Sequence, residues 1–234
     1  MLEFYRDFLG GELIRASHIP SSDTKLAYVQ IGERVVEFLC PPQADPSRLG
    51  LEHIAFSVDD LDRSYENMKA AGVVFSVAPK TAGSGVGRVA FLSDPDGIRV
   101  ELLAQPRFNR PVSTLKMNGH LADTDHVSLR VADAARSRAF YERHFGAKRM
   151  TFDYMACGAN VLELVQVNGG EPPAGSRLQH LALRVDDVDR TVADFAGAGI
   201  RIDGEPRDAA TRIGRVAVIL DRIEVLDRAD LRKL

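Results

Sequence analysis

The chain repeats itself, and this repeat constrains its fold more than any other feature of its sequence. Residues 51–63 read LEHIAFSVDDLDR and residues 178–190 read LQHLALRVDDVDR, so the two segments align without a gap. Two shorter pairs of segments are also similar: 4–11 with 140–147, and 87–92 with 214–219. Self-similarity of this kind indicates related structural units that bury their apolar faces against one another. We therefore interpret the chain as a tandem duplication.

Each half of the duplication contains two smaller modules. The segment DHVSLRVAD at 125–133 shares its alternation and its histidine position with the segments at His53 and His180. Stretches rich in proline or polar residues separate the modules, as expected for connections. Residues 106–123 form the best candidate for a domain linker. The expected modules are 1–41, 50–105, 123–168 and 176–228, and the expected domains are 1–108 and 120–234.

The spacing of apolar residues changes within a module. Residues 53–58 alternate between apolar and polar side chains, which is typical of a strand, and apolar residues within 61–69 then recur at helical spacing. Strand-like segments follow at 88–92 and 98–103, around a turn with the sequence DPDG. This order predicts an α+β module in which a helix covers one face of a small sheet.

Composition excludes several classes of protein. The 30 Lys and Arg residues nearly balance the 33 Asp and Glu residues, and no basic run carries interleaved aromatic residues, so a nucleic-acid partner is not expected. The longest apolar runs are about five residues, against the roughly 20 of a membrane helix, so no membrane association is expected either. The first residues are charged and amphipathic, unlike a secretion signal, which predicts a cytoplasmic protein.

Three histidines occupy equivalent positions at the start of predicted strands: His53, His126 and His180. In each strand the following residues alternate, so that apolar side chains form one face and the histidine shares the other with small or polar residues. The apolar face must pack in the core. The histidine face is therefore expected to line a cleft.

Each module also ends in an apolar strand with a glutamate at its centre. These glutamates are Glu37, Glu101, Glu163 and Glu224. A carboxylate within an apolar strand is costly unless it is paired, hydrogen-bonded or bound to a cation, and four equivalent copies indicate one common kind of partner. Imidazole and carboxylate ligands together suit Zn, Ni, Co, Mn or Fe(II), so we expect a divalent metal.

Together these features resemble the vicinal oxygen chelate superfamily, which includes glyoxalase I, methylmalonyl-CoA epimerase, bleomycin-resistance proteins and extradiol dioxygenases. The resemblance rests on the paired modules, on HIAFSVDDL at 53–61, on Phe-Tyr and Leu-Gly within 4–10, and on DPDG followed by Glu-Leu within 94–102. It covers nearly the whole chain. It implies two βαβββ modules per domain, curled into a half-barrel cleft, with ligands from the first and last strands of both modules.

The resemblance implies a complete set of metal ligands in the second domain. These are His126, Glu163, His180 and Glu224. The first domain departs from the pattern, because its entire first strand is absent and the matching ligand would fall before Met1. It keeps Glu37, His53 and Glu101.

Two explanations fit the missing strand. Either the sequence begins inside a longer gene product, or domain 1 has lost a ligand and serves as a partner for domain 2. In both cases the missing strand leaves an unpaired sheet edge. We expect another segment or a second subunit to cover this edge, and a homodimer would supply the subunit.

The function implied by the resemblance is that of a metal-dependent isomerase or lyase of glyoxalase or epimerase type. In such a reaction a divalent metal polarises a carbonyl or thioester oxygen and stabilises an enediolate, and Glu163 and Glu224 are the predicted catalytic bases. Arg130 and Arg184, on the predicted cleft face, are the predicted binding residues for a small anionic substrate.

Two alternative functions use the same cleft. An extradiol-type ring-cleaving dioxygenase would use His126, His180 and Glu224 as an iron triad, which leaves Glu163 without a role. A metal-free protein of the same superfamily that binds a small molecule would instead neutralise its carboxylates with guanidinium groups. The candidate arginines are Arg130, Arg184 and Arg222.

Overall fold

The structure is a computed structural model that describes residues 2–43, 45, 49–106, 121–167 and 177–229. Within these residues the strands form three sheets. The expected linker at 106–123 lies almost entirely outside the described residues. No helix in the described part of the chain is long and apolar enough to cross a membrane.

The first module is a three-stranded antiparallel sheet that a short helical segment precedes. Its sheet has the order β1-β2-β3. In the described part of this module no strand precedes the helical segment, which confirms that the first strand of a βαβββ unit is missing here. The elements are η1 (Phe4–Phe8), β1 (Glu12–Ile19), β2 (Thr24–Ile31) and β3 (Arg34–Cys40).

The second module is a complete βαβββ unit. Its sheet has the order β4-β7-β6-β5, with β4 parallel to β7 and the other pairs antiparallel. The segments predicted from apolar spacing are confirmed as a strand, a helix and two further strands. The elements are β4 (Ile54–Ser57), α1 (Leu61–Ala70), β5 (Phe75–Thr81), β6 (Arg88–Ser93) and β7 (Arg99–Ala104).

The third and fourth modules join in one eight-stranded sheet. Its order is β13-β14-β15-β12-β8-β11-β10-β9, so the first strands of the two modules, β8 and β12, pair antiparallel at its centre. The third module comprises β8 (Leu121–Val131), α2 (Ala134–Phe145), β9 (Lys148–Arg149), β10 (Tyr154–Cys157) and β11 (Asn160–Gln166). The fourth comprises β12 (Leu178–Val185), α3 (Val188–Gly197), β13 (Ile202–Asp208), β14 (Arg215–Ile219) and β15 (Ile223–Asp227).

The same local signal starts the helix in each complete module. An aspartate, Asp60, Asp133 or Asp187, stands in extended conformation before the helix and accepts a hydrogen bond from a backbone N–H of its first turn. Such N-caps satisfy donors that the helix leaves unpaired. The repeated Val-Asp-Asp and Val-Ala-Asp sequences therefore fix where each strand gives way to its helix.

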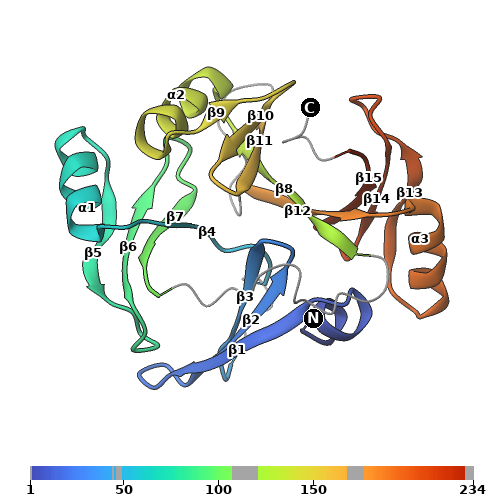
Figure 1. Cartoon of the computed structure of the whole chain (residues 1–234), viewed down its shortest axis with the longest axis horizontal. Helices are drawn as coiled ribbons and strands as arrows, with labels where there is room; N and C mark the ends of the chain where they lie inside the picture. Colours follow the sequence, from blue (N-terminus) through green and yellow to red (C-terminus); the bar gives the residue numbers. More distant parts are fainter. Residues whose placement is uncertain (1, 44, 46–48, 107–120, 168–176, 230–234) are drawn as a thin grey trace.

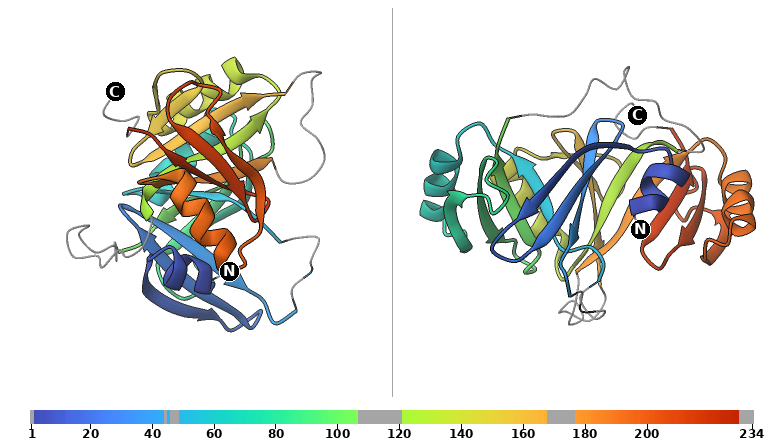
Figure 2. Two further views of the ribbon diagram at one scale, coloured as in Figure 1. Left: turned by 90° about the vertical axis from the view of Figure 1, so that its right-hand side faces the viewer. Right: turned by 90° about the horizontal axis from the view of Figure 1, so that it is seen from below.

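The apolar faces of the modules pair across the two halves of the chain. One core cluster combines the second and third modules, and another combines the first and fourth. Helices α1 and α3 consequently lie at opposite ends of the molecule, with the sheets between them (Figures 1 and 2). The two halves are thus packed into one another rather than joined only by a linker.

The turn predicted at residues 94–97 also connects the halves. Its carboxylates are buried against α2, where Asp94 accepts a hydrogen bond from Tyr141 Oη at 2.9 Å. Asp96 accepts from the backbone N–H of Ala132 at 2.8 Å and from Ser137 Oγ. The turn was predicted from its sequence, whereas its role as a contact between modules was not.

Candidate metal centre

The second half of the chain brings its four predicted ligands to one face of the eight-stranded sheet. His126 lies on β8, where Ser128 is paired with Glu163 of β11 on one side and with His180 of β12 on the other. Beyond β12, the register of β15 places Glu224 on the same face. Because residues paired across strands, or two apart on one strand, project from the same face, the four side chains converge.

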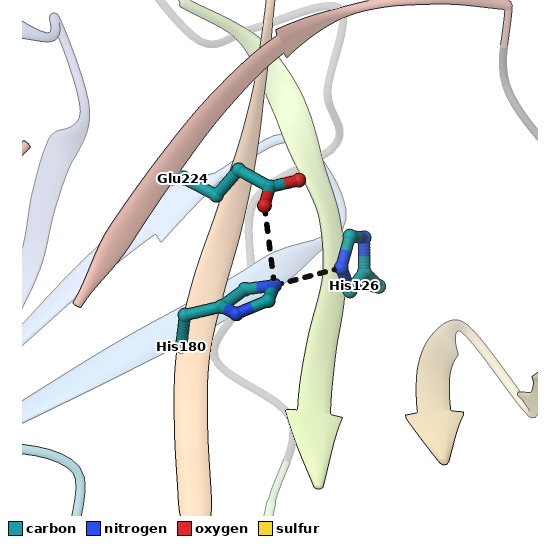
Figure 3. A group of neighbouring side chains, drawn as sticks. All are labelled: His126, His180 and Glu224. Atoms are coloured by element: carbon teal, nitrogen blue, oxygen red, sulfur yellow. Dashed lines mark hydrogen bonds and ion pairs between the residues drawn. The ribbon is translucent and has the colours of Figure 1, made fainter. Parts of the chain in front are cut away.

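The ligand atoms of these residues lie close together. His126 Nε2 lies 3.1 Å from His180 Nε2 and 3.4 Å from Glu163 Oε2. His180 Nε2 lies 3.7 Å from Glu163 Oε2 and 3.7 Å from Glu224 Oε2. Figure 3 shows His126, His180 and Glu224 pointing toward one another, and each offers an atom within 4.8 Å of the other two. We call these four residues the second-half cluster.

Two further side chains hold His126 in place. Asp125 Oδ1 lies 2.8 Å from His126 Nδ1, and since a carboxylate can only accept, Nδ1 carries the proton and Nε2 faces the cluster. Arg228 donates to the same carboxylate and, at 3.2 Å, to Tyr154 Oη. The side chains of His126, Asp125 and Arg228 are 1%, 2% and 3% exposed, so surrounding atoms fix this arrangement.

The electrostatics of the second-half cluster favour one positive charge, on His126, and a neutral His180. Burial by itself lowers the pKa of His126, but the hydrogen bonds with Asp125 and Glu163 outweigh it and raise this pKa to about 9. Burial and the charge of His126 lower the pKa of His180 to about 4, which leaves a neutral imidazole. Burial raises the pKa of Glu163, yet its hydrogen bond with His126 brings the value down to about 2.

The second-half cluster fits a divalent cation. Its donors are two imidazole nitrogens and two carboxylates, the mixture that borderline first-row metals prefer. The hydrogen bond between Asp125 and His126 is the carboxylate support that metal-binding histidines usually have. The hydrogen bonds with Asp125 and Glu163 that raise the pKa of His126 favour a protonated imidazole, so a cation bound at Nε2 would replace that proton.

A pocket of about 130 Å³ opens beside the cluster. Glu163 and Glu224 belong to its wall, so their carboxylates face both the histidines and the pocket. Thr211, in the loop between β13 and β14, also lines it, and Thr211 Oγ1 is buried without a hydrogen-bond partner among the described residues. Three larger polar side chains also line it, Tyr154, Arg207 and Arg228, and the rest of the wall is apolar. A small polar molecule bound there would touch both carboxylates.

Comparison with known families agrees with this geometry. The model of the Glyoxalase/Bleomycin resistance protein/Dioxygenase superfamily matches residues 1–102 and 124–222, which is most of the chain. The chain belongs to this superfamily. The resemblance inferred from the repeated motifs is thereby confirmed, together with the fold class.

Curated relatives include proteins named as lactoylglutathione lyases. The chain is 29% identical over 226 residues to a probable chloroplastic lactoylglutathione lyase of Arabidopsis thaliana, which covers 88% of this chain and 61% of the relative. It is 34% identical over 112 residues to the lactoylglutathione lyase of Escherichia coli O157:H7, covering 44% of this chain and 82% of that protein. The chain thus spans less than two thirds of the longer Arabidopsis relative.

Solved structures show the same fold at low sequence identity. A Mn(II)-bound glyoxalase from Novosphingobium aromaticivorans superposes with a TM-score of 0.67 at 18% identity, over 98% of this chain and 79% of that one. The 2,3-dioxygenase LapB from Pseudomonas sp. KL28 has the same TM-score at 17% identity, over 97% of this chain and 86% of that one. These two structures, one a glyoxalase and one a dioxygenase, are therefore equally similar to this chain in fold.

The first half of the chain contains a smaller cluster of candidate metal ligands. Glu37 of β3, His53 just before β4 and Glu101 of β7 offer ligand atoms within 4.8 Å of one another, and we call them the first-half cluster. His53 Nε2 lies 3.1 Å from Glu101 Oε2, and Tyr28 forms a hydrogen bond with Glu37, whose pKa burial raises. His53 Nδ1 is buried without a partner among the described residues. The three predicted remnants thus come together from two separate sheets.

Two of the arginines predicted on the cleft face are engaged elsewhere. Arg184 Nη2 lies 3.4 Å from Asp123 Oδ2, and Arg184 Nη1 lies 3.9 Å from Asp125 Oδ2. Arg222 donates to the carbonyl oxygen of Leu178 at 3.1 Å. Neither arginine belongs to the wall of the pocket.

Arg130 acts on the second-half cluster through its charge, which contributes to the low pKa of His180. The ion pairs that the described residues form with Glu163 and Glu224 are to imidazoles, and none is to a guanidinium. The arrangement expected of a metal-free site, with arginines neutralising these carboxylates, is therefore not the arrangement in this part of the chain.

Several polar residues of the site were not identified from the sequence, among them Asp125, Arg228 and Arg207. Asp125 directly precedes His126, and Arg228 lies four residues after Glu224, so strand alternation places it on the same face. Arg228 could have been found from the strand pattern, whereas Asp125 could not, because alternation alone would place it on the face opposite His126 and the pairing of β8 with β12 is irregular at this point. Arg207 has no comparable signal, because its place in the wall depends on how β13 and its loop fold back over the sheet.

Proposed function

We propose that the protein is a metal-dependent lyase or isomerase of glyoxalase type that acts on a small anionic carbonyl or thioester compound. The observation that carries this proposal is the convergence of His126, His180, Glu163 and Glu224 beside a polar pocket. The names of the curated relatives, which are lactoylglutathione lyases, point to the same class of reaction.

The proposed metal would be held by the second-half cluster. A bound divalent cation would supply Lewis-acid polarisation of a carbonyl oxygen. The chain itself would supply a proton acceptor. Glu163 approaches both histidines, whereas the one ion pair of Glu224 among the described residues is to His180 at 3.7 Å. Glu224 is therefore the less constrained carboxylate, and we assign it the proton transfer, with Glu163 as the second candidate.

Positive side chains would orient the substrate. Arg207 lines the pocket close enough to Glu224 that its charge lowers the pKa of that carboxylate, against the larger effect of burial, which raises it. We propose Arg207 and Arg130 as residues that attract an anionic substrate group. Arg184, which is paired with Asp123 and Asp125, would influence the substrate only through these carboxylates.

The test combines metal analysis with turnover. Protein purified without chelator should contain divalent metal, and it should form lactoylglutathione from methylglyoxal and glutathione. Glu224→Gln should lower kcat by roughly 10²–10⁴, the usual contribution of a positioned acid or base, while the circular dichroism spectrum stays unchanged. The second measurement starts from protein stripped of metal and incubated with Zn, Ni, Co, Mn or Fe(II). If less than one ion per chain is then bound, the proposal is contradicted and the metal-free binding function remains.

One observation favours a second candidate function. His126, His180 and Glu224 lie mutually within 4.8 Å, and two histidines with one carboxylate form the iron site of many oxygenases. An extradiol-type dioxygenase would use this triad without Glu163. Oxygen uptake with catechols after loading with Fe(II) would support this candidate, and its absence together with lyase activity would exclude it.

The first-half cluster is proposed as a weaker metal site. It offers three candidate ligands rather than four, and Nδ1 of one of them, His53, has no partner among the residues that the structure describes. We expect the wild-type chain to bind a second equivalent of metal at higher concentration. Glu101→Gln should remove this second equivalent and leave the first unchanged, whereas loss of the first equivalent would contradict the assignment.

A further inference from the structure

Arg34, at the start of β3 in the first half, reaches into the second half. Its Nη1 donates to the carbonyl oxygen of Thr124 at 2.8 Å and to Thr124 Oγ1 at 2.9 Å, and it lies 3.3 Å from Asp123 Oδ1. Its Nη2 donates to the carbonyl oxygen of Ala159. The Arg34 side chain is 11% exposed; its bonds with Thr124 and Asp123 are partly buried, whereas its bond with Ala159 lies at the surface.

The two carbonyl groups that Arg34 bridges belong to strands that carry ligands. Thr124 lies on β8 two residues before His126, and Ala159 lies in the turn that leads into β11, four residues before Glu163. One planar guanidinium therefore links the beginnings of the parallel strands β8 and β11. Since the two donor directions of a guanidinium are fixed, this link sets the spacing of the two strands where they approach the cluster.

A second set of contacts connects Arg34 with β12, the strand that carries His180. Asp123 accepts contacts from Arg34 and from Arg184 of β12. Arg184 lies four residues after His180, on the same strand face, and its other nitrogen lies 3.9 Å from Asp125 Oδ2. Asp125 in turn holds His126 Nδ1. The contacts therefore run from the first half through a chain of alternating charges to the histidine itself.

The turn before β3 is shaped for this contact. Gly32 has a φ of +57°, and a Cβ atom at this position would lie 2.0 Å from Asp123 Oδ1. Only glycine allows both the backbone conformation and the close approach. The turn thus carries two independent features, a glycine and an arginine, that bring it against the same carboxylate.

We propose that Arg34 is a positioning residue for the second-half cluster, by which the first half of the chain sets the geometry of a metal centre that lies wholly in the second half. The inference rests on the proposed metal site. It assigns the first half a role in that centre that is independent of the ligands Glu37, His53 and Glu101.

The experiment measures metal affinity and coordination in full-length protein. All variants also carry Glu101→Gln, which should abolish metal binding at the first-half cluster. The measured affinity then belongs to the second-half cluster alone. Co(II) is the probe, with its dissociation constant taken from competition with a chelator and its visible absorption spectrum as a report of coordination. Arg34→Met should weaken Co(II) binding about tenfold or more, the range typical of residues that support metal ligands, and should change the spectrum. Arg34→Lys should give an intermediate value, because a lysine reaches one carbonyl group but cannot bridge two.

Two further variants separate positioning from simple loss of stability. Gly32→Ala keeps Arg34 but moves the turn away from Asp123, and it should weaken Co(II) binding in the same direction. Arg88→Met removes an exposed ion pair with Asp62 in the same half, and it should leave affinity and spectrum unchanged. Arg34→Met protein with a lower melting temperature but an unchanged dissociation constant and spectrum would overturn the inference. Protein that carries only Glu101→Gln and binds no Co(II) would instead refute the proposed metal site.

Discussion

At the scale of single residues, the site depends on how a neighbour fixes each ligand. His126 carries its proton on Nδ1 because Asp125 can only accept there, and Arg228 neutralises that carboxylate from the other side. A ligand held in one tautomer and one orientation loses less freedom when it binds a cation. The affinity of the second-half cluster should therefore depend on residues that are not ligands.

Asp125→Asn tests this dependence. The amide can still accept the His126 hydrogen bond, but it removes the negative charge that makes the imidazole a better ligand and leaves Arg228 without its ionic partner. Metal affinity should fall about 10- to 100-fold, measured by chelator competition. Asp189→Asn, at an exposed ion pair with Arg215, is the control and should have no effect. Equal affinities for Asp125→Asn and wild-type protein would show that Asp125 does not support the ligand.

The convergence of the second-half cluster could be predicted from the sequence because its residues recur with the strand pattern; their role as metal ligands stays a prediction. Histidines at the start and glutamates near the centre of apolar strands appear in several modules, and alternation alone places them on one face. Arg184 illustrates what alternation cannot supply. It lies on the same face as His180, yet its partners Asp123 and Asp125 come from the neighbouring strand, so its role depends on register.

At the scale of elements, the turn between β6 and β7 acts as a buried contact. Asp94 accepts hydrogen bonds from Tyr141 Oη and from the backbone N–H groups of Asp96 and Ile98. Burial raises the pKa of Asp94 from 3.8 to about 6, because these bonds do not fully replace water around the carboxylate. Sequence identified the turn by its composition, but nothing local in a turn shows which helix it will meet.

The raised pKa makes the contribution of Asp94 depend on pH. Because the folded pKa exceeds the unfolded value, the contribution is complete below about pH 3.8 and is lost as the pH rises through about 6. The shift of about two units corresponds to roughly 3 kcal/mol. The asparagine of Asp94→Asn cannot ionise, so the variant should not lose this contribution as the pH rises. The free energy of unfolding of the variant minus that of the wild type, measured by urea denaturation, should therefore increase between about pH 4 and about pH 7.5. Exposed Asp62→Asn is the control, and a difference for Asp94→Asn that is independent of pH would contradict the shift.

At the scale of the whole molecule, the cores do not follow the duplication. Each half contributes its strands to its own sheets, but the apolar faces pair the first module with the fourth and the second with the third. The repeat in the sequence reveals how many modules there are, whereas their pairing depends on which faces meet after folding. The expected domains at 1–108 and 120–234, the cytoplasmic location and the homodimer stay predictions.

Cross-half packing predicts that the chain unfolds as one unit. Leu9 is fully buried in the core that joins the first and fourth modules. Leu9→Ala should lower the free energy of unfolding by about 2–5 kcal/mol and shift a single calorimetric transition as a whole. Leu49→Ala, at a side chain that is 67% exposed, should change little. Two transitions, only one of which moves, would show that the halves fold independently.

The sharing of each core between halves has a consequence for divergence after duplication. A module can stop coordinating an ion and still be indispensable, since its partner's hydrophobic surface would otherwise face solvent. Selection for solubility then preserves both copies, even where selection for chemistry acts on one. A cluster of three candidate ligands in the first half, beside four in the second, is the kind of difference that such a division of labour permits.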